Sequence, residues 1–248
     1  MNLGGKTAIV TGGASGFGAG IVECFAQAGA NVVIADLNGD AAEAMAKQVG
    51  NNAMAVPCDV SKLSDFESVA AHTKEAFGSV DILVNNAGVG QSPQALEDVD
   101  EALFDKILDV NVRSIYNGAR SIVPLMKENE AGAILNVAST GAVRPRPNLS
   151  WYNASKGWAA TATRAMAIEL AEFGIRVNAI NPVAGMTPML KTFMKEDSDA
   201  QRQSMINTIP LGRLSTPEDM GHAAVFLCSP QAAMITGVTL EVDGGRCI

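Results

Sequence analysis

The stretch Thr11-Gly12-Gly13-Ala14-Ser15-Gly16-Phe17-Gly18 decides the fold. It follows the apolar run of residues 7–11, which is typical of a buried strand, and precedes a helical stretch that ends at Gly29. Its glycines have the spacing GxxxGxG rather than the strict GxGxxG. Glycines in such a turn let the backbone approach a pyrophosphate, while the following helix directs its N-terminal N–H groups toward it. The same turn could serve structure alone, but its place between a first strand and a first helix favours phosphate binding.

Strand and helix patterns alternate along the rest of the chain. The predicted strands cover residues 7–11, 31–36, 53–57, 80–85, 133–138, 175–180 and 238–242. Helical patterns lie between them, including 41–49, 62–77 and about 151–173. This alternation predicts a single doubly wound α/β Rossmann domain over residues 1–248, with a seven-stranded parallel sheet and helices on both faces.

Residues 186–211 interrupt this regularity. The stretch carries Lys, Glu, Asp, Ser and Gln without a clean strand pattern. A long irregular insertion in a compact domain is usually a lid or a binding loop. We therefore expect a substrate flap at about 186–211.

Composition excludes several classes of function. The chain has 248 residues, of which 48% are hydrophobic, and a formal net charge of −8. This charge argues against nucleic-acid or anionic-membrane partners, because little would neutralise their phosphates. No apolar run approaches the roughly 18 residues of a membrane span, and no secretory signal pattern opens the sequence. These features predict a cytoplasmic protein that acts on a small molecule.

Cysteine and histidine offer no sites of their own. The four cysteines are scattered without CxxC spacing, as expected for reduced thiols in a cytoplasm. His72 and His222 lie on separate helical stretches without a partner at ligand spacing. We therefore expect no metal and no Ser-His-Asp triad.

Asp36 indicates which cofactor the turn would serve. It ends the second predicted strand, where an adenosine ribose arrives in this fold, and its carboxylate can accept hydrogen bonds from the ribose hydroxyls. The same carboxylate would repel a 2′-phosphate. The neighbours that could bind such a phosphate, Ser15 and Leu37, are neither Arg nor Lys. NAD is therefore the predicted cofactor.

Tyr152 and Lys156 lie four residues apart on one helix face, a spacing that also occurs in exposed structural pairs. Carbonyl reduction needs an acid beside the substrate oxygen, and alcohol oxidation needs the same group as a base. Lowering the tyrosine pKa from near 10 to about 7 requires roughly 4 kcal/mol. An ammonium about 4 Å away supplies on the order of 4 kcal/mol at an effective dielectric constant of 20. Ser139 would hydrogen-bond the substrate oxygen, and Asn111 would hold a water that relays protons to Lys156.

Together these motifs resemble the short-chain dehydrogenase/reductase family over essentially the whole chain. Asp59-Val60, Asn85-Asn86-Ala87-Gly88 and Asn178-Ala-Ile-Asn181-Pro182 followed by Thr187 are similar to further family motifs. The resemblance implies a homotetramer and a catalytic tetrad of Asn111, Ser139, Tyr152 and Lys156. The cofactor-binding residues predicted from the motifs and the resemblance are Gly12, Ser15, Gly16, Phe17, Gly18, Asp36, Leu37, Asp59, Val60, Asn86, Ala87, Gly88, Tyr152, Lys156, Pro182, Val183 and Thr187.

One departure from the family pattern follows the sixth strand. The family usually has Pro-Gly there, whereas this chain has Pro182-Val183. We expect the backbone at Val183 to keep a negative φ, which valine tolerates. The expected result is an altered nicotinamide pocket in which binding is kept.

These observations predict an NAD-dependent oxidoreductase that moves a hydride between the nicotinamide and a carbonyl or secondary alcohol. The substrate classes are a polyol, a sugar, a cyclic alcohol or a hydroxy acid. A 3-oxoacyl-carrier-protein reductase is the first alternative, against which Asp36 and the acidic charge argue, because such enzymes usually prefer NADPH and offer basic residues to their acidic carrier. A non-catalytic NAD-sensing regulator is the second, but a sensor has no need of a matched Tyr–Lys pair.

The loop of residues 140–150 lies between Ser139 and Tyr152, so its side chains should lie near the substrate. It carries Arg144-Pro145-Arg146-Pro147, in which the prolines restrict the backbone. The tentative substrate residues are Ser139, Arg144, Arg146 and Tyr152, the two arginines serving to bind an anionic group. The alternative is that the arginines pair with acidic residues at a subunit interface or face water.

Overall fold

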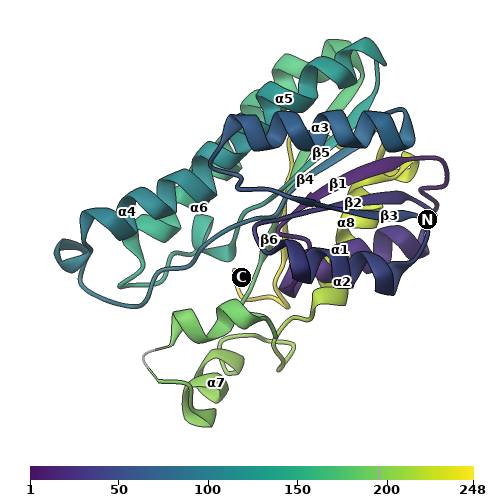
Figure 1. The fold of residues 1–248 in the computed structure, drawn as a ribbon. Helices are drawn as coiled ribbons and strands as arrows, with labels where there is room; N and C mark the ends of the chain where they lie inside the picture. Colours follow the sequence, from purple (N-terminus) through teal and green to yellow (C-terminus); the bar gives the residue numbers. More distant parts are fainter. Residues whose placement is uncertain (195) are drawn as a thin grey trace.

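The computed structural model describes residues 1–194 and 196–248, and its strands form one parallel sheet (Figure 1). The strand order is β3-β2-β1-β4-β5-β6-β7. The strands are β1 (Thr7–Thr11), β2 (Asn31–Asp36), β3 (Ala53–Pro57), β4 (Ile82–Asn85), β5 (Gly132–Val137), β6 (Ile175–Pro182) and β7 (Thr239–Val242). The predicted seven-stranded doubly wound sheet is confirmed.

Helices cover both faces of this sheet, because successive strand residues point to opposite sides. Ala8 and Val10 of β1 pack in one core cluster, whereas Ile9 between them packs in the other. The first cluster includes side chains from α1 (Gly16–Gln27), α2 (Gly39–Val49) and α8 (Pro217–Cys228). The second includes α3 (Leu63–Phe77), α5 (Ser114–Glu128) and α6 (Ser150–Leu170). Strands covered on both faces have continuous apolar runs, which is why the sequence shows them so clearly.

The strand order reverses at β1, which pairs with β2 on one side and β4 on the other. In open parallel sheets a crevice forms at this switch, outside the carboxyl ends of the strands. The turns that follow β1, β4, β5 and β6 therefore meet at one edge, which positions the site described below.

The segment between β6 and α8 is more regular than predicted. A 3-10 helix over Pro188–Phe193 and the helix α7 (Asp199–Ile206) occupy most of it. Ser198 caps α7 by accepting a hydrogen bond from the Gln201 backbone N–H. A small apolar cluster, which includes Leu190, Met194 and Met205, holds these helices together. The expectation of an irregular insertion is wrong here, because too few apolar residues marked a helical face. Residue 195 lies outside the described residues, and the division into one domain with a flap stays a prediction.

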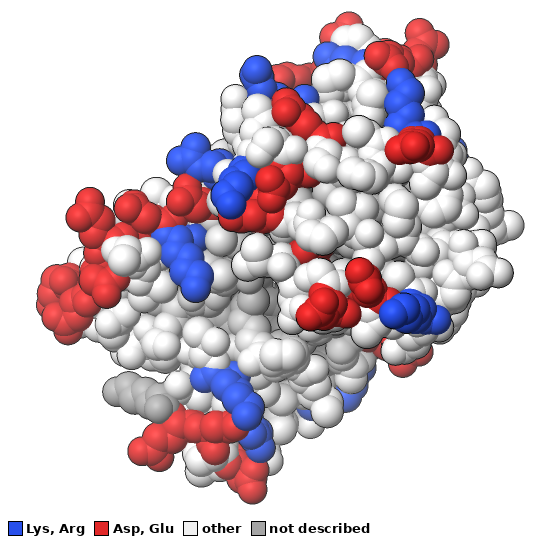
Figure 2. Space-filling view, viewed as in Figure 1, with Lys and Arg blue, Asp and Glu red and all other residues white. Residues whose placement is uncertain are grey.

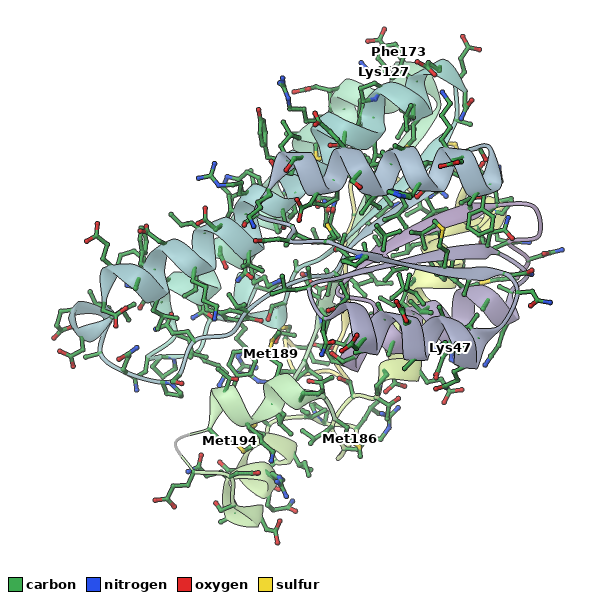
Figure 3. All side chains as sticks on the ribbon, in the orientation of Figure 1. Lys47, Lys127, Phe173, Met186, Met189 and Met194 are labelled. Atoms are coloured by element: carbon green, nitrogen blue, oxygen red, sulfur yellow. The ribbon has the colours of Figure 1, made fainter. Side chains whose placement is uncertain are left out.

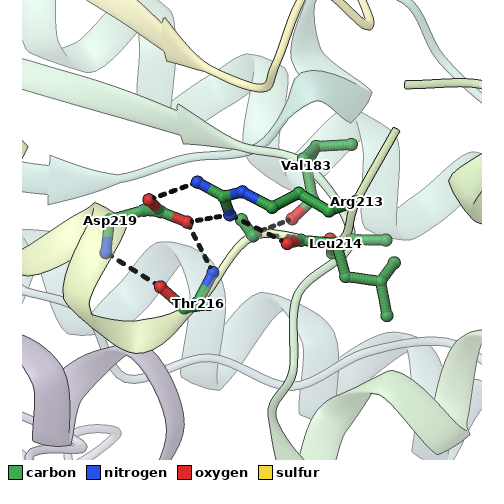
Figure 4. A network of polar contacts seen from close by, with 7 residues as sticks. Val183, Arg213, Leu214, Thr216 and Asp219 are labelled. Atoms are coloured by element: carbon green, nitrogen blue, oxygen red, sulfur yellow. Dashed lines mark hydrogen bonds and ion pairs between the residues drawn. The ribbon is translucent and has the colours of Figure 1, made fainter. Parts of the chain in front are cut away.

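The carboxyl-terminal end of this segment is anchored to α8 (Figure 4). The Arg213 guanidinium donates to both carboxylate oxygens of Asp219, at 2.6 and 2.8 Å. Asp219 also closes a capping box with Thr216, the N-cap residue of α8. Together these contacts hold the pKa of the Asp219 carboxyl well below its ordinary value, the Arg213 hydrogen bond being the largest cause. One end of the predicted flap is thus fastened to the body of the protein.

Within residues 1–194 and 196–248, none of the helices combines the length and apolar character needed to cross a membrane.

Candidate active site

A cavity of about 590 Å³ follows the carboxyl edge of the sheet. Its walls come from the turns after β1 to β6, from α6, from the segment between β6 and α8, and from the end of the chain. Figure 2 shows the molecule hollowed near its centre, above the part that carries α7. Among the predicted cofactor residues, Ser15, Asp36 and Leu37 line the cavity at one end and Tyr152 and Lys156 line it further along.

The glycine turn after β1 fits a phosphate. Gly12 has a φ of +61°, and a Cβ on Gly18 would lie 2.1 Å from the Gly12 carbonyl oxygen. Glycine is therefore required at both positions. Asn86 fastens the turn by donating to the carbonyls of Thr11 and Gly12. Ser15 is the N-cap residue of α1, yet its side chain makes no capping hydrogen bond. The first turn of α1 is thus left open for an anionic ligand.

Asp36 lies at the carboxyl end of β2, as predicted. Its carboxylate accepts hydrogen bonds from the backbone N–H groups of Ala14 and Asn38, each at 3.0 Å. A carboxylate has about four acceptor positions, so a pair remains for a diol such as a ribose. Leu37 beside it is 77% exposed and brings no positive charge. This end of the cavity suits an adenosine without a 2′-phosphate.

Asp59 and Val60 line the same end of the cavity. The Asp59 carboxylate accepts from both the backbone N–H and the hydroxyl of Ser61, and the hydroxyl bond is the largest cause that lowers the Asp59 pKa. The Asp59 carboxylate therefore stabilises the loop in which it lies.

The helix α6 brings Tyr152 and Lys156 into the cavity, both of them buried. The Lys156 ammonium donates to the Val137 carbonyl at 2.9 Å and lies 6.0 Å from the centroid of the Tyr152 ring. Burial lowers the pKa of Lys156 to about 8. The lysine is thus near the tyrosine, as predicted, and close to its own titration point at neutral pH.

The pKa of Tyr152 corrects the prediction made from the sequence. Burial raises this pKa, while a hydrogen bond with the Ser139 hydroxyl and the charge of Arg146 oppose the increase. The prediction that Lys156 lowers the tyrosine pKa is therefore wrong for the protein alone, because the cost of burying a phenolate outweighs the nearby charges. Ser139 lies against Tyr152, two residues beyond the last residue of β5, Val137.

Asn111 is placed differently from its predicted role. It lies in a π-helical turn, Asp109–Arg113, and is not among the residues that line the cavity. Its side-chain oxygen accepts from the Val89 N–H, and its amide donates to the Val89 carbonyl and the Ser155 hydroxyl. Since the side chain is occupied by protein partners, it supports the cavity wall. Any water that it helps to position would have to bind to the main chain of this turn.

Only part of the motif predicted at the end of β6 lines the cavity. Pro182, Val183 and Thr187 line the cavity, as predicted. Asn178 from the same motif does not, because it donates to the Ile235 carbonyl and accepts from the Val238 N–H. Only Glu130 and Asn148 among the described non-glycine residues have a positive φ, so Val183 has the expected backbone conformation.

Beyond Tyr152 the cavity is lined mainly by apolar side chains. The ring of Phe193 lies edge-on to the Tyr152 ring, with 5.0 Å between centroids. Leu149, Met189, Leu190 and Met205 contribute to the same wall. Figure 3 shows Met189 between the sheet and the lower part of the molecule, whereas Met194 lies lower. The sequence did not single out these residues, because no motif marks an apolar lining.

The two arginines of the loop before α6 are separated. Arg146 lines the cavity, and so does Arg246, which the sequence analysis missed. Arg144 does not line it. Its guanidinium donates to the backbone carbonyls of Arg246 and Ile248, at 3.0 and 3.2 Å. The structure therefore removes Arg144 from direct contact with a ligand in the cavity. Arg246 lies too far along the chain for any spacing to connect it with Tyr152.

Comparisons with known proteins cover nearly the whole chain. A family model described as Enoyl-(Acyl carrier protein) reductase matches residues 12–246. 4-Formylbenzenesulfonate dehydrogenase TsaC1/TsaC2 of Comamonas testosteroni is 44% identical over 100% of both chains. The 7alpha-hydroxysteroid dehydrogenase of Escherichia coli (strain K12) is 38% identical over 99% of this chain and 95% of its own length.

Solved structures agree in fold and in cofactor. A structure described as 3-ketoacyl-(acyl-carrier-protein) reductase from Brucella melitensis, complexed with NADH, is 53% identical with a TM-score of 0.96 and covers 100% of both chains. A 7 alpha-hydroxysteroid dehydrogenase complexed with NADH and 7-oxo glycochenodeoxycholic acid is 38% identical with a TM-score of 0.92, covering 98% of this chain and 95% of that one. This chain belongs to the short-chain dehydrogenase/reductase family, as its motifs predicted.

Proposed function

We propose that this protein is an NAD(H)-dependent oxidoreductase that interconverts an alcohol and a carbonyl group on a small cyclic or aromatic substrate. The observation that carries the proposal is the convergence of Tyr152, Ser139 and Lys156 beside an apolar wall, in the cavity that the glycine turn also lines. Bound NAD(H) accepts or supplies the hydride. The protein must bind the substrate oxygen and move its proton.

The three side chains have complementary roles in this proposal. The Ser139 hydroxyl donates a hydrogen bond to the substrate oxygen, and Tyr152 exchanges a proton with it. Because burial raises the pKa of Tyr152, the phenol keeps its proton at neutral pH and is ready to act as the acid in carbonyl reduction. Alcohol oxidation needs the phenolate, which the Lys156 ammonium favours while it is protonated, although burial outweighs this charge in the protein alone. We expect oxidation to require a higher pH than reduction.

NAD(H) is the proposed cofactor because Asp36 lies where a 2′-phosphate would have to fit. The solved relatives that contain NADH support this choice. The homotetramer that the family resemblance implies and the cytoplasmic location that the scattered cysteines predict belong to the same proposal.

A cyclic substrate is favoured over a polyol or a sugar by the lining of the cavity. Phe193, Leu190 and Met205 present ring and aliphatic carbon atoms, which match an apolar ring better than a chain of hydroxyl groups. Relatives of this chain are named as dehydrogenases of 4-formylbenzenesulfonate, of a hydroxysteroid and of 2,5-dichloro-2,5-cyclohexadiene-1,4-diol, which are all ring compounds.

Reduction of a 3-oxoacyl group on a carrier protein is the second candidate. It is supported by the 53% identical structure described as such a reductase. Because that structure contains NADH, cofactor choice does not separate the two candidates. The net charge of −8 argues against docking of an acidic carrier, and the exposed acidic side chains gathered at the α4 (Glu101–Leu108) end in Figure 2 add to this argument.

A test of both candidates measures NADH consumption with a panel of benzaldehydes and cyclic ketones, and with acetoacetyl carrier protein. We expect higher kcat/KM for members of the ring panel. The variant Tyr152→Phe serves as the control for enzyme-dependent turnover. A preference for the carrier-bound substrate would select the second candidate, and tight NADH binding without any turnover would favour the sensor.

A further inference from the structure

Two arginines at the substrate end of the cavity have no carboxylate at ion-pair distance among the residues that the structure describes. Arg146 comes from the loop before α6 and Arg246 from the turn after β7, and both line the cavity. Among the described residues, neither guanidinium makes an ion pair or a hydrogen bond, whereas Arg213 and Arg113 bind carboxylates. Two half-buried cations therefore lie near each other, and neither guanidinium has a carboxylate at ion-pair distance in the described part of the chain.

The electrostatic cost of this arrangement falls on Arg146. Burial lowers its pKa, and the positive charge of Arg246 lowers it further. Tyr152 is also within electrostatic range of Arg146. Such a pair of like charges is stabilised by an anion that lies between them. The pyrophosphate turn and Asp36 form the other end of the cavity, so the cofactor phosphates bind elsewhere.

We propose that Arg146 and Arg246 form a subsite for a carboxylate or sulfonate group carried by the ring of the substrate. This proposal rests on the proposed function and names its substrate class. Each guanidinium offers a planar set of donors that matches the oxygens of these groups. The ring would then lie along Phe193 and Leu190, with its reacting carbon at Tyr152.

Arg144 has a different task, which is to position Arg246. Pro145 separates it from Arg146, and its guanidinium binds the carbonyls of Arg246 and Ile248. The turn that carries Arg246 depends on Gly244 and Gly245, with φ values of +61° and +89°. Arg146 thus contributes its guanidinium to the cavity, whereas Arg144 holds the turn that carries Arg246.

The turn that carries Arg246 also contacts the end of the predicted flap. The Leu211 N–H donates to the Gly244 carbonyl at 3.1 Å, and a Cβ on Gly244 would lie 2.7 Å from Ile209. The subsite is therefore assembled from three segments: the loop before α6, the end of the flap, and the chain after β7. Figure 1 shows the C-terminus between the sheet and the part with α7.

The test compares anionic substrates with neutral substrates of matched shape. The pairs are 4-formylbenzoate with 4-formylbenzamide, and 4-formylbenzenesulfonate with 4-formylbenzenesulfonamide. The measured quantity is the ratio of kcat/KM for the anionic member to that for the neutral member, with NADH as cofactor. Because the ratio is taken within one variant, general damage to catalysis cancels. Melting temperature and NADH affinity are measured for every variant as a check on folding.

We expect the wild type to prefer the anionic member, and Arg146→Met or Arg246→Met to lower the ratio by roughly ten- to hundredfold, the range of a charge-assisted hydrogen bond. The matched control Arg164→Met removes an exposed guanidinium of α6 and keeps the wild-type ratio. Arg144→Met lowers the ratio less and increases hydrogen exchange over residues 243–248. If the kcat/KM ratio falls only for the carboxylate pair or only for the sulfonate pair, that result shows which of the two anionic groups the subsite binds.

Two results would overturn the subsite. One is a wild type that treats the members of each pair equally. The other is a preference for the anion that both arginine variants retain. In either case turnover of the neutral aldehydes would leave the proposed function standing. Absence of turnover for all four compounds, with NADH still bound, would instead contradict the proposed function.

Discussion

The two ends of the cavity are built in different ways. At the cofactor end the wall is main chain: Gly12 and Gly18 pack against backbone atoms, and Asp36 is held by two backbone N–H groups. At the substrate end the wall is side chain, with Phe193 and Arg246 from segments far apart in the sequence. A Cβ on Gly12 or Gly18 would lie 3.0 or 2.1 Å from backbone atoms, so these positions allow almost no substitution. Side chains of similar volume at the substrate end can replace one another.

This difference explains why the two ends can evolve separately. The cofactor end must accommodate one ligand, and its glycines are fixed by contacts that any Cβ would break. The substrate end can change its ligand by changing side chains on the flap and in the chain after β7. Tyr152 and Lys156 stand where the two ends meet, on a helix that packs against β6. Four predictions test this division.

The largest effect is expected at Tyr152, where the cofactor end and the substrate end of the cavity meet. Tyr152→Phe removes the transferable proton and keeps the ring against Phe193, so kcat should fall on the order of 10³-fold. NADH affinity, measured by fluorescence titration, should change little because the cofactor end is main chain. A variant that keeps a tenth of wild-type kcat would exclude Tyr152 as the acid.

The next effect concerns Lys156 and pH. The pKa of Lys156 is about 8 in the folded protein, and its ordinary value is 10.5. Between these two pH values the lysine is therefore protonated in the unfolded chain and largely deprotonated in the folded protein. As the pH rises through this range, the free energy of unfolding of the wild type should therefore increase relative to that of Lys156→Met, by up to about 3 kcal/mol. Groups that titrate in both proteins cancel in the difference.

Urea unfolding of the cofactor-free wild type and of Lys156→Met at pH 7 and at pH 10.5 measures this gain. If the difference in unfolding free energy between the two proteins were the same at both pH values, Lys156 would titrate normally. The surroundings of Lys156 would then be more hydrated than its burial indicates.

A smaller effect is expected at the cofactor end. The wild type should favour NAD over NADP by at least about tenfold in kcat/KM, equal to roughly 1.4 kcal/mol. Asp36→Ala combined with Leu37→Arg should narrow or reverse this ratio, since a repulsive carboxylate is replaced by a phosphate partner. The relative activity on anionic and neutral aldehydes should not move, because that selection belongs to the other end. Equal use of NADP by the wild type would contradict the role given to Asp36.

The same division decided what could be predicted from the sequence. The bounds of β1, β2 and β3 agree with the prediction. The apolar runs of β1 and β2 are almost entirely buried, whereas β3 at the edge of the sheet is only partly buried. The glycine turn, Asp36 and Tyr152 could be placed because their chemistry depends on short spacings.

The errors arose where tertiary contacts decide the outcome. Strand β4 begins at Ile82 rather than at 80, because the Asp81 carboxylate accepts from the Lys6 ammonium and the Thr7 N–H. Asn111 is engaged by partners that no spacing reveals. Arg246 joins the cavity through a turn that Arg144 and the Asp243 carboxylate hold.

The smallest effect, and the one that bears most directly on the comparison, concerns the motion of residues 186–211. This segment has its own small cluster around Leu190 and Met205, and Arg213 ties its far end to α8. Because it contributes side chains to the cavity wall, ligands that fill the cavity should restrain it. Hydrogen exchange should be faster here than in the sheet without ligands, and slower once NADH and an inert substrate analogue are both bound. The glycine turn after β1 should gain protection from NADH alone. Equal protection of 186–211 in all states would make the segment a fixed wall, and the substrate end would then be as rigid as the cofactor end.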